Sequence, residues 1–175
     1  TEGFCKTIQA YAALILANMQ GKNGIRETFT DLTAPGDLLK PGKFGTYESA
    51  LIACKKLADD GLTALNAGGT VFPFPLTSSM GWAGFNTVAD MKKVNRAIAA
   101  RIAMYQKDWP GMITALNASF LSLSGSLSAG PNMVFSTAAN DQSNGLFHTP
   151  DATGAPYVVF NNVIADAEAG DTRLT

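Results

Sequence analysis

The only histidine of the chain, His148, is the first residue to consider for catalysis. A hydrolase triad needs a base that is oriented by a carboxylate and lies next to a nucleophile, and the spacing around His148 supports none. The basic residues Lys92, Lys93, Arg96 and Arg101 are close in sequence, but no glycine-rich phosphate loop accompanies them. We therefore predict a chain that is not an enzyme and holds no cofactor, with these four cations on a hydrated helix flank.

The most polar cluster of the sequence is residues 140–145, NDQSNG. Its oxygens, including those of Asp141 and Asn144, are suited to hydroxyl groups or to a calcium ion. The cluster lacks the acidic spacing of an EF-hand loop, and no glutamate closes it. A turn whose Asn and Asp side chains bond their own backbone is therefore the first interpretation.

The two cysteines, Cys5 and Cys54, show no CxxC spacing. We expect two buried, inert thiols, with a disulfide or a metal pair as the alternatives.

Composition excludes several classes of protein. The 175 residues are 46% hydrophobic and 15% charged, which is too apolar for a disordered tail. The net charge of −1 provides no cationic field for nucleic acid or an anionic membrane. The longest apolar run, Ala10–Ala17, is much shorter than the roughly 20 residues that span a bilayer. Because both ends fall within local patterns, we expect a piece of a longer protein.

Four stretches have helical periodicity. The first covers Glu2–Gln20 and ends at Gly21. Its apolar stripe is Phe4, Ile8, Tyr11, Ile15 and Met19, and Leu14 and Leu16 widen this stripe, so we expect the helix to be covered on most sides. The second covers Thr46–Ala67, with Thr46 as its cap, and Gly61 inside it is expected to cost about 1 kcal/mol relative to alanine. Its apolar face is Tyr47, Leu51, Cys54, Ala58, Leu62 and Leu65.

The third and fourth helices are predicted to form an antiparallel hairpin, because almost no loop separates them. A capping box of Thr87 and Asp90 begins a helix that runs to about Lys107. Its buried stripe is Met91, Val94, Ile98, Ile102 and Tyr105, with Ala100 elsewhere on the helix. Asp108 caps the next helix, which Gly125 ends. Its inward residues are Trp109, Met112, Leu116, Phe120 and Leu123.

Long connections over 22–45, 68–86 and 126–156 separate or follow these helices, and residues 157–160 form a short β-prone run. Loops of this length usually carry function or need support from other parts of a protein. We predict an all-α fold with long irregular loops and minor β structure in the C-terminal part, as one region over 1–175.

The segment 95–109, NRAIAARIAMYQKDW, resembles the helical hairpin of the SusD/RagB family. In that family a helix of small residues ends in Ala-Arg-x-x-x-Tyr, and a Gly/Lys-Asp-Trp turn leads into a second helix. Residues 3–21 and 47–65 resemble earlier family helices, and 165–173 resembles a segment ending in Gly-Asp-x-Arg. The family's N-terminal lipidated cysteine and its C-terminal half have no counterpart here.

This resemblance implies a cell-surface lipoprotein of the outer membrane in a Bacteroidota-type bacterium. Such proteins bind glycans or other small nutrients and act as a lid on a SusC-like TonB-dependent transporter. Their scaffold is a set of tetratricopeptide-like helix pairs, and a lipid anchor, absent from this chain, is their attachment to the membrane.

Glycan binding by such a protein uses flat aromatic faces, with amides and carboxylates for the hydroxyl groups. The candidate ligand-binding residues implied by the resemblance are Trp82, Phe85, Asp141, Asn144 and Tyr157. Trp82 stands out because Gly81 and Gly84 leave its ring accessible. The alternative for Trp82 and Phe85 is a plug over the helix that follows.

A rival interpretation is a tetratricopeptide-like adaptor that binds peptides in a helical groove. Such a solenoid requires three or more repeats with a period of about 34 residues. The irregular spacing of the four predicted helices disfavours it.

Overall fold

The structure is a computed structural model that describes residues 1–26, 44–126, 128–132, 135, 166 and 169. The chain divides into two compact units, 1–133 and 134–175, and the first unit holds the helices described below. The β-prone run 157–160 and the polar cluster 140–145 lie outside the described residues. The prediction of one continuous region over 1–175 therefore stays a prediction.

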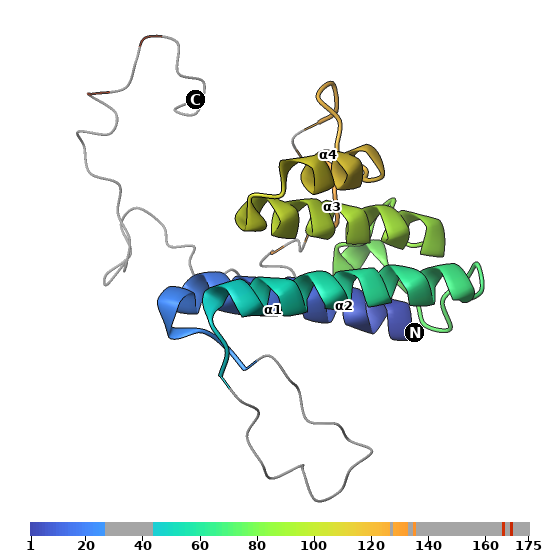
Figure 1. The fold of residues 1–175 in the computed structure, drawn as a ribbon. Coiled ribbons are helices and arrows are strands. Elements are labelled where there is room, and N and C mark those ends of the chain that lie inside the picture. The colour runs from blue at the N-terminus through green and yellow to red at the C-terminus, as the bar shows by residue number, and fades with distance from the viewer. Residues whose placement is uncertain (27–43, 127, 133–134, 136–165, 167–168, 170–175) are drawn as a thin grey trace, which may run out of the picture. The chain divides into compact units, whose positions relative to one another are not determined.

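The described part of the first unit is built from four α-helices (Figure 1). They are α1 (Glu2–Gln20), α2 (Tyr47–Ala67), α3 (Val88–Gln106) and α4 (Trp109–Asn117), with short 3-10 turns η1 (Gly21–Asn23) and η2 (Ser78–Met80). Each helix packs on its neighbour in sequence, and α1 also contacts α3. The described residues contain no strand, only one isolated antiparallel bridge between Arg26 and Phe44. The prediction of an all-α class is confirmed for this part of the chain.

Local capping explains where the helices begin. The Thr46 hydroxyl accepts a hydrogen bond of 3.2 Å from the Ser49 amide, and the Thr87 hydroxyl accepts one of 3.1 Å from the Asp90 amide. The Asp108 carboxylate accepts from the Gly111 amide at 3.0 Å. These three predicted caps are confirmed, and each satisfies an amide that the first helical turn leaves without a partner.

The tight turn of the α3–α4 hairpin depends on Lys107. This residue has a φ of 60°, in the left-handed region that few non-glycine residues adopt. The conformation lets the Asp108 amide donate to the Ala103 carbonyl at 2.9 Å, which closes the end of α3. Asp108 then begins α4 directly, so the predicted hairpin is confirmed.

The buried face of α1 differs from the predicted stripe. Tyr11 and Ile15 are each 40% exposed, and Met19 is 78% exposed. The residues that face the core are smaller: Gly3, Thr7, Ala10, Ala13, Leu14 and Ala17. The prediction is confirmed for Phe4 and Ile8, which are partly buried against core residues, and for Leu14, which is buried. It was wrong for Tyr11, Ile15, Leu16 and Met19, because it followed large apolar side chains, whereas close packing of two helices selects small ones.

Two glycines allow α1 and α2 to pack closely against each other. A Cβ atom on Gly3 would lie 2.7 Å from the Gly61 carbonyl oxygen and 2.7 Å from the Leu65 amide nitrogen. A Cβ atom on Gly61 would lie 2.9 Å from the Thr7 hydroxyl oxygen. Gly61 was predicted only as a cost to helix stability, but its missing side chain is what lets the two helices meet here.

The α4 helix is shorter than predicted and ends at Asn117 rather than near Gly125. The Ser119 hydroxyl donates to the Leu116 carbonyl at 2.7 Å and accepts from the Leu121 amide at 3.1 Å. This serine thus satisfies backbone groups that a longer helix would pair, and competes with helical structure.

Three predicted positions in the hairpin are also corrected. Trp109 is 53% exposed and Leu123 is fully exposed, so neither faces inward. Leu123 follows the end of α4, and so has no helical face to share with Met112 and Leu116. Ala100, predicted outside the apolar stripe, is buried because α3 contacts both α2 and α4 and so buries more than one face.

The loop after η1 returns to its starting point at the beginning of α2. The Gly45 amide donates to the Ile25 carbonyl at 3.0 Å. Gly24 has a φ of 68°, and a Cβ atom there would lie 1.8 Å from the Gly45 carbonyl oxygen. We name residues 24–26 and 44–45 the loop neck.

No helix in the described ranges is both long enough and apolar enough to cross a bilayer.

Candidate functional site

Trp82 and Phe85 lie in the connection between η2 and α3, and both are half-buried. The Trp82 amide donates to the Thr77 carbonyl at 3.2 Å, and the Phe85 amide donates to the Trp82 carbonyl at 2.9 Å. Gly81, with a φ of 84°, precedes the tryptophan and allows the tight turn. The positions of both rings are therefore set by the backbone of this turn.

The two rings contact different partners, one on α1 and one in the segment that follows α4. The Trp82 ring centroid lies 5.5 Å from that of Phe4 on α1. Phe85 packs edge-on against Phe120, with centroids 4.9 Å apart. Phe4 also packs against Phe72 and Phe74 from the same connection, with centroids 5.8 and 5.2 Å away. The connection over 68–86, which lacks α-helix, is thus attached to the frame by aromatic pairs.

Packing does not bury Trp82 completely, because its ring also forms one wall of a cavity of about 330 Å³. We name this the Trp82 cavity. Its walls come from α1, from one face of α3, from the connection that carries Trp82, and from Phe120 and Pro131, which follow α4. The lining residues are Ile8, Tyr11, Trp82, Val94, Ala97, Ile98, Arg101, Phe120 and Pro131.

The wall at Pro131 is held in place by backbone contacts. The Asn132 amide donates to the Gly81 carbonyl at 2.9 Å, which ties this segment to the turn that carries Trp82. Gly130 has a φ of 135°, and a Cβ atom there would lie 3.1 Å from the Phe120 ring. Two loops that are distant in sequence therefore meet at the cavity.

Arg101 is the only charged residue among the described residues that line the Trp82 cavity. The ion pairs of the described residues use Lys6, Lys55, Lys56, Lys93 and Arg96, but not Arg101. The described lining contains no carboxylate, imidazole or thiol. The described lining can therefore bind a molecule through apolar contact, aromatic stacking and one positive charge.

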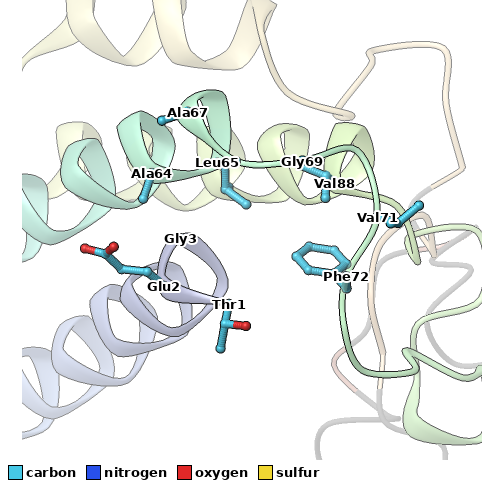
Figure 2. A pocket seen from close by; sticks show the side chains of 11 residues that line it. Thr1, Glu2, Gly3, Ala64, Leu65, Ala67, Gly69, Val71, Phe72 and Val88 are labelled. Carbon is cyan, nitrogen blue, oxygen red and sulfur yellow. The ribbon is translucent and has the colours of Figure 1, made fainter.

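A second cavity, of about 310 Å³, lies between the start of α1, the end of α2 and the loop that follows (Figure 2). Most of its lining is backbone and small side chains, and its charged residue is Glu2. The Glu2 carboxylate pairs with Lys6 at 2.8 Å, and this hydrogen bond lowers the pKa of Glu2. With its carboxylate already paired, this cavity offers less to a ligand than the Trp82 cavity.

A buried polar network links three helices and was missed by the sequence prediction. Asn95 on α3 is fully buried, and its amide nitrogen donates to the Thr7 hydroxyl at 2.8 Å and to the Ala58 carbonyl at 2.9 Å. Thr7, also fully buried, donates to the Gly3 carbonyl at 2.7 Å. The sequence holds one indication of this network: Asn95 lies four residues after Met91, on a helix face that is otherwise apolar.

Arg96 extends this network toward the surface. Its guanidinium donates to the Asn95 side-chain oxygen at 2.9 and 2.7 Å and to the Asp59 carboxylate at 3.1 Å. Burial raises the pKa of Asp59, but hydrogen bonds from Lys55 and Arg96 and their charges together lower it below its usual value. The Arg96 side chain is 17% exposed, so the prediction of a hydrated flank was wrong at this position.

The two cysteines differ in environment. Cys54 is 1% exposed, and burial raises the pKa of its thiol to about 11. Cys5 is exposed, which corrects the expectation that both thiols are buried. Both are free thiols, and the described residues contain no group of three or more potential metal ligands.

Of the five predicted ligand-binding residues, the structure describes Trp82 and Phe85. Both pack against a group of core residues that includes Val88 and Met91 at the start of α3, as the plug alternative expects, and of the two only Trp82 lines the cavity. Asp141, Asn144 and Tyr157 lie outside the described residues, as does His148. Tyr11 and Arg101 line the cavity but were not predicted as ligand-binding residues. In the sequence, these two residues could have been recognised as an aromatic and a cationic side chain that lie beside apolar positions on their helices.

Comparison of the chain with protein-family models, curated proteins and solved structures finds no significant match.

Proposed function

We propose that this chain is the helical part of a non-catalytic nutrient-binding protein of the SusD/RagB kind. In this proposal it binds a glycan or another small nutrient at the cell surface and delivers it to a TonB-dependent transporter of the outer membrane. The observation that carries the proposal is the Trp82 cavity, which joins an accessible aromatic wall to the hairpin segment that resembles the family.

The proposed division of labour is a rigid frame with loops that contact the ligand. The helices, as tetratricopeptide-like pairs, hold the cavity floor through buried contacts such as the Thr7–Asn95 hydrogen bond. The loops supply Trp82 and Pro131 on the other side. An aromatic ring binds the C–H face of a sugar through dispersion, so a wall of this type suits a cyclic ligand. Affinity and delivery, rather than bond cleavage, are then the tasks of the chain.

The test compares the two tryptophans of the chain. Trp82→Ala is expected to weaken binding of a ligand from a glycan panel by about fivefold, in line with roughly 1 kcal/mol for an aromatic contact. Trp109→Ala is the matched control, because Trp109 is exposed on α4 and does not line the cavity. Binding is measured by isothermal titration calorimetry, and folding by circular dichroism.

Trp82 also packs on Phe4, so its removal carries a risk of unfolding. Tyr11→Ala provides a second variant, since Tyr11 lines the cavity but is 40% exposed. Glycan affinity that is unchanged in folded Trp82→Ala and Tyr11→Ala would refute a role for this cavity. Turnover of any panel glycan would refute the non-catalytic assignment.

The adaptor alternative draws on a different observation. Ile15, Leu16 and Met19 form an exposed apolar group on α1, which suits a peptide or protein partner. An adaptor predicts that Ile15→Asp abolishes peptide binding, whereas the nutrient-binding proposal predicts unchanged ligand affinity for that variant.

A further inference from the structure

We infer that the Trp82 cavity selects a small ring-shaped ligand that carries one carboxylate, with Arg101 binding the carboxylate and Trp82 contacting the ring. This inference rests on the proposed function and names the chemical class of the nutrient. It draws on three properties of the cavity: its apolar lining, the single cation among its described lining residues, and its size.

The lining is poorly matched to a neutral ligand with many hydroxyl groups. Six of the lining side chains, Ile8, Val94, Ala97, Ile98, Phe120 and Pro131, have no polar atom. A sugar hydroxyl that faces such a wall loses its hydrogen bonds to water without replacement, which costs binding free energy. A ligand with an apolar ring face avoids this cost.

The charge is concentrated at one end of the cavity floor. Val94, Ala97, Ile98 and Arg101 follow a spacing of three, one and three residues, which places them on one face of α3. Three apolar side chains therefore lead along the helix to one guanidinium. This geometry fits a ligand with an apolar body and an acidic group at one end.

Among the described residues, Arg101 forms no ion pair, and three acids of α2, α3 and the α3–α4 turn are engaged with other groups. Asp59 pairs with Lys55 and Arg96, and Asp90 pairs with Lys93 and with the hydroxyl of the Thr87 cap. The Asp108 carboxylate accepts from the Gly111 amide. Arginine is suited to the task, since its planar guanidinium binds a carboxylate through two parallel hydrogen bonds.

The size of the cavity favours a compact ligand. A volume of about 330 Å³ is at the lower end of the range for small-molecule sites, roughly 300–1,000 Å³. One ring with a short acidic substituent fits a volume of this size.

The test uses two pairs of probes that differ in charge. Phenylacetate is compared with phenylacetamide, and glucuronate with glucose, by titration calorimetry at low ionic strength. For the unmodified chain we expect each acid to bind about tenfold more tightly than its neutral partner, because hydrogen bonds to a charged group are the strong ones. The comparison between the two acids shows whether the ring is apolar or a sugar.

Arg101→Gln is expected to remove the preference for the acids while leaving the melting temperature unchanged, since Arg101 is exposed. Arg101→Lys should restore part of the preference. Lys92→Gln is the matched control, because it removes one cation from the same helix outside the cavity lining. Preference for the acids should be intact in this control.

Two results would overturn the inference. One is equal affinity for charged and neutral probes in the unmodified chain, and the other is an acid preference that survives in Arg101→Gln. Binding of neutral glycans that depends on Trp82 but not on Arg101 would overturn this inference and leave the proposed function standing. Absence of binding by all four probes and by the glycan panel would refute both.

Discussion

The hydrogen bond between Thr7 and Asn95 can be measured directly by a double-mutant cycle. Thr7→Val keeps the volume of the side chain but removes the hydroxyl, which accepts from Asn95 and donates to the Gly3 carbonyl. Asn95→Ala removes the donor to Thr7, the donor to Ala58 and the acceptor of the Arg96 guanidinium. Because both residues are fully buried, water has no access to the groups that lose their partners.

The expected magnitudes follow from the bonds that each variant loses. A buried hydrogen bond contributes about 1 kcal/mol net, so Thr7→Val should lower the free energy of unfolding by about 1–2 kcal/mol. Asn95→Ala loses more bonds and leaves a cavity, so we expect a loss of about 3–4 kcal/mol. The double variant should lose about 1 kcal/mol less than the sum of the two, since the shared bond is counted only once.

Urea denaturation followed by far-UV circular dichroism measures all four corners of the cycle. Thr63→Val is the control, because its hydroxyl donates to a carbonyl of its own helix and is exposed, and it should change the stability by less than about 0.5 kcal/mol. Strict additivity of Thr7→Val and Asn95→Ala would refute the assignment of this hydrogen bond as a link between α1 and α3.

Three further predictions concern packing, reactivity and pH. Gly3→Ala should destabilise the fold by about 2 kcal/mol or more, since its Cβ atom would meet backbone atoms that cannot move aside, whereas Gly69→Ala, with nothing within 4 Å, should have little effect in the same denaturation assay. Cys5 should react with a thiol reagent such as DTNB at pH 8 at least tenfold faster than Cys54, which is buried and has a pKa of about 11; equal rates in single-cysteine variants would contradict the structure. The pKa of Asp59 is lower in the folded chain than its value of 3.8 in the unfolded chain, so the ionised carboxylate stabilises the fold at pH values above 3.8. This stabilisation is lost as the pH falls through the folded pKa. In thermal melts, the stability advantage over Asp59→Asn should therefore be present at pH 7 and shrink below about pH 4.

Features that depend on a few neighbouring residues could be predicted from the sequence. The caps at Thr46, Thr87 and Asp108 involve a side chain and an amide three residues later, so their pattern is visible in the chain itself. The hairpin turn was predictable for the same reason, because a helix cap directly follows the end of the preceding helix.

Features that depend on contacts between distant residues could not be predicted in the same way. Gly61 can be interpreted only when Thr7 is known to lie against it. Arg96 resembles any surface cation until Asp59 and Asn95 are placed beside it. The end of α4 was also missed, because the competing hydrogen bonds of Ser119 are made after the helix, in a stretch whose apolar spacing continues.

For the candidate site, the sequence predicted a partly accessible ring at Trp82, which lines a cavity, but not the surroundings of that ring; its role in binding stays a prediction. The flanking glycines drew attention to Trp82. The cavity beside it requires Ile8, Ile98 and Pro131, which are brought together only by the packing of α1 on α3 and by the contact of the 128–132 segment with Gly81.

The loop neck has a consequence for how this protein can change over evolution. Its two glycines and the hydrogen bond between Gly45 and Ile25 bring the chain back to the point where it left the helices. Once such a closure exists, doubling the number of residues beyond it costs only about 0.6 kcal/mol in chain entropy. Insertions and deletions between positions 26 and 44 can therefore accumulate while the register of α1 against α2 is kept, which makes this position a natural point for diversification.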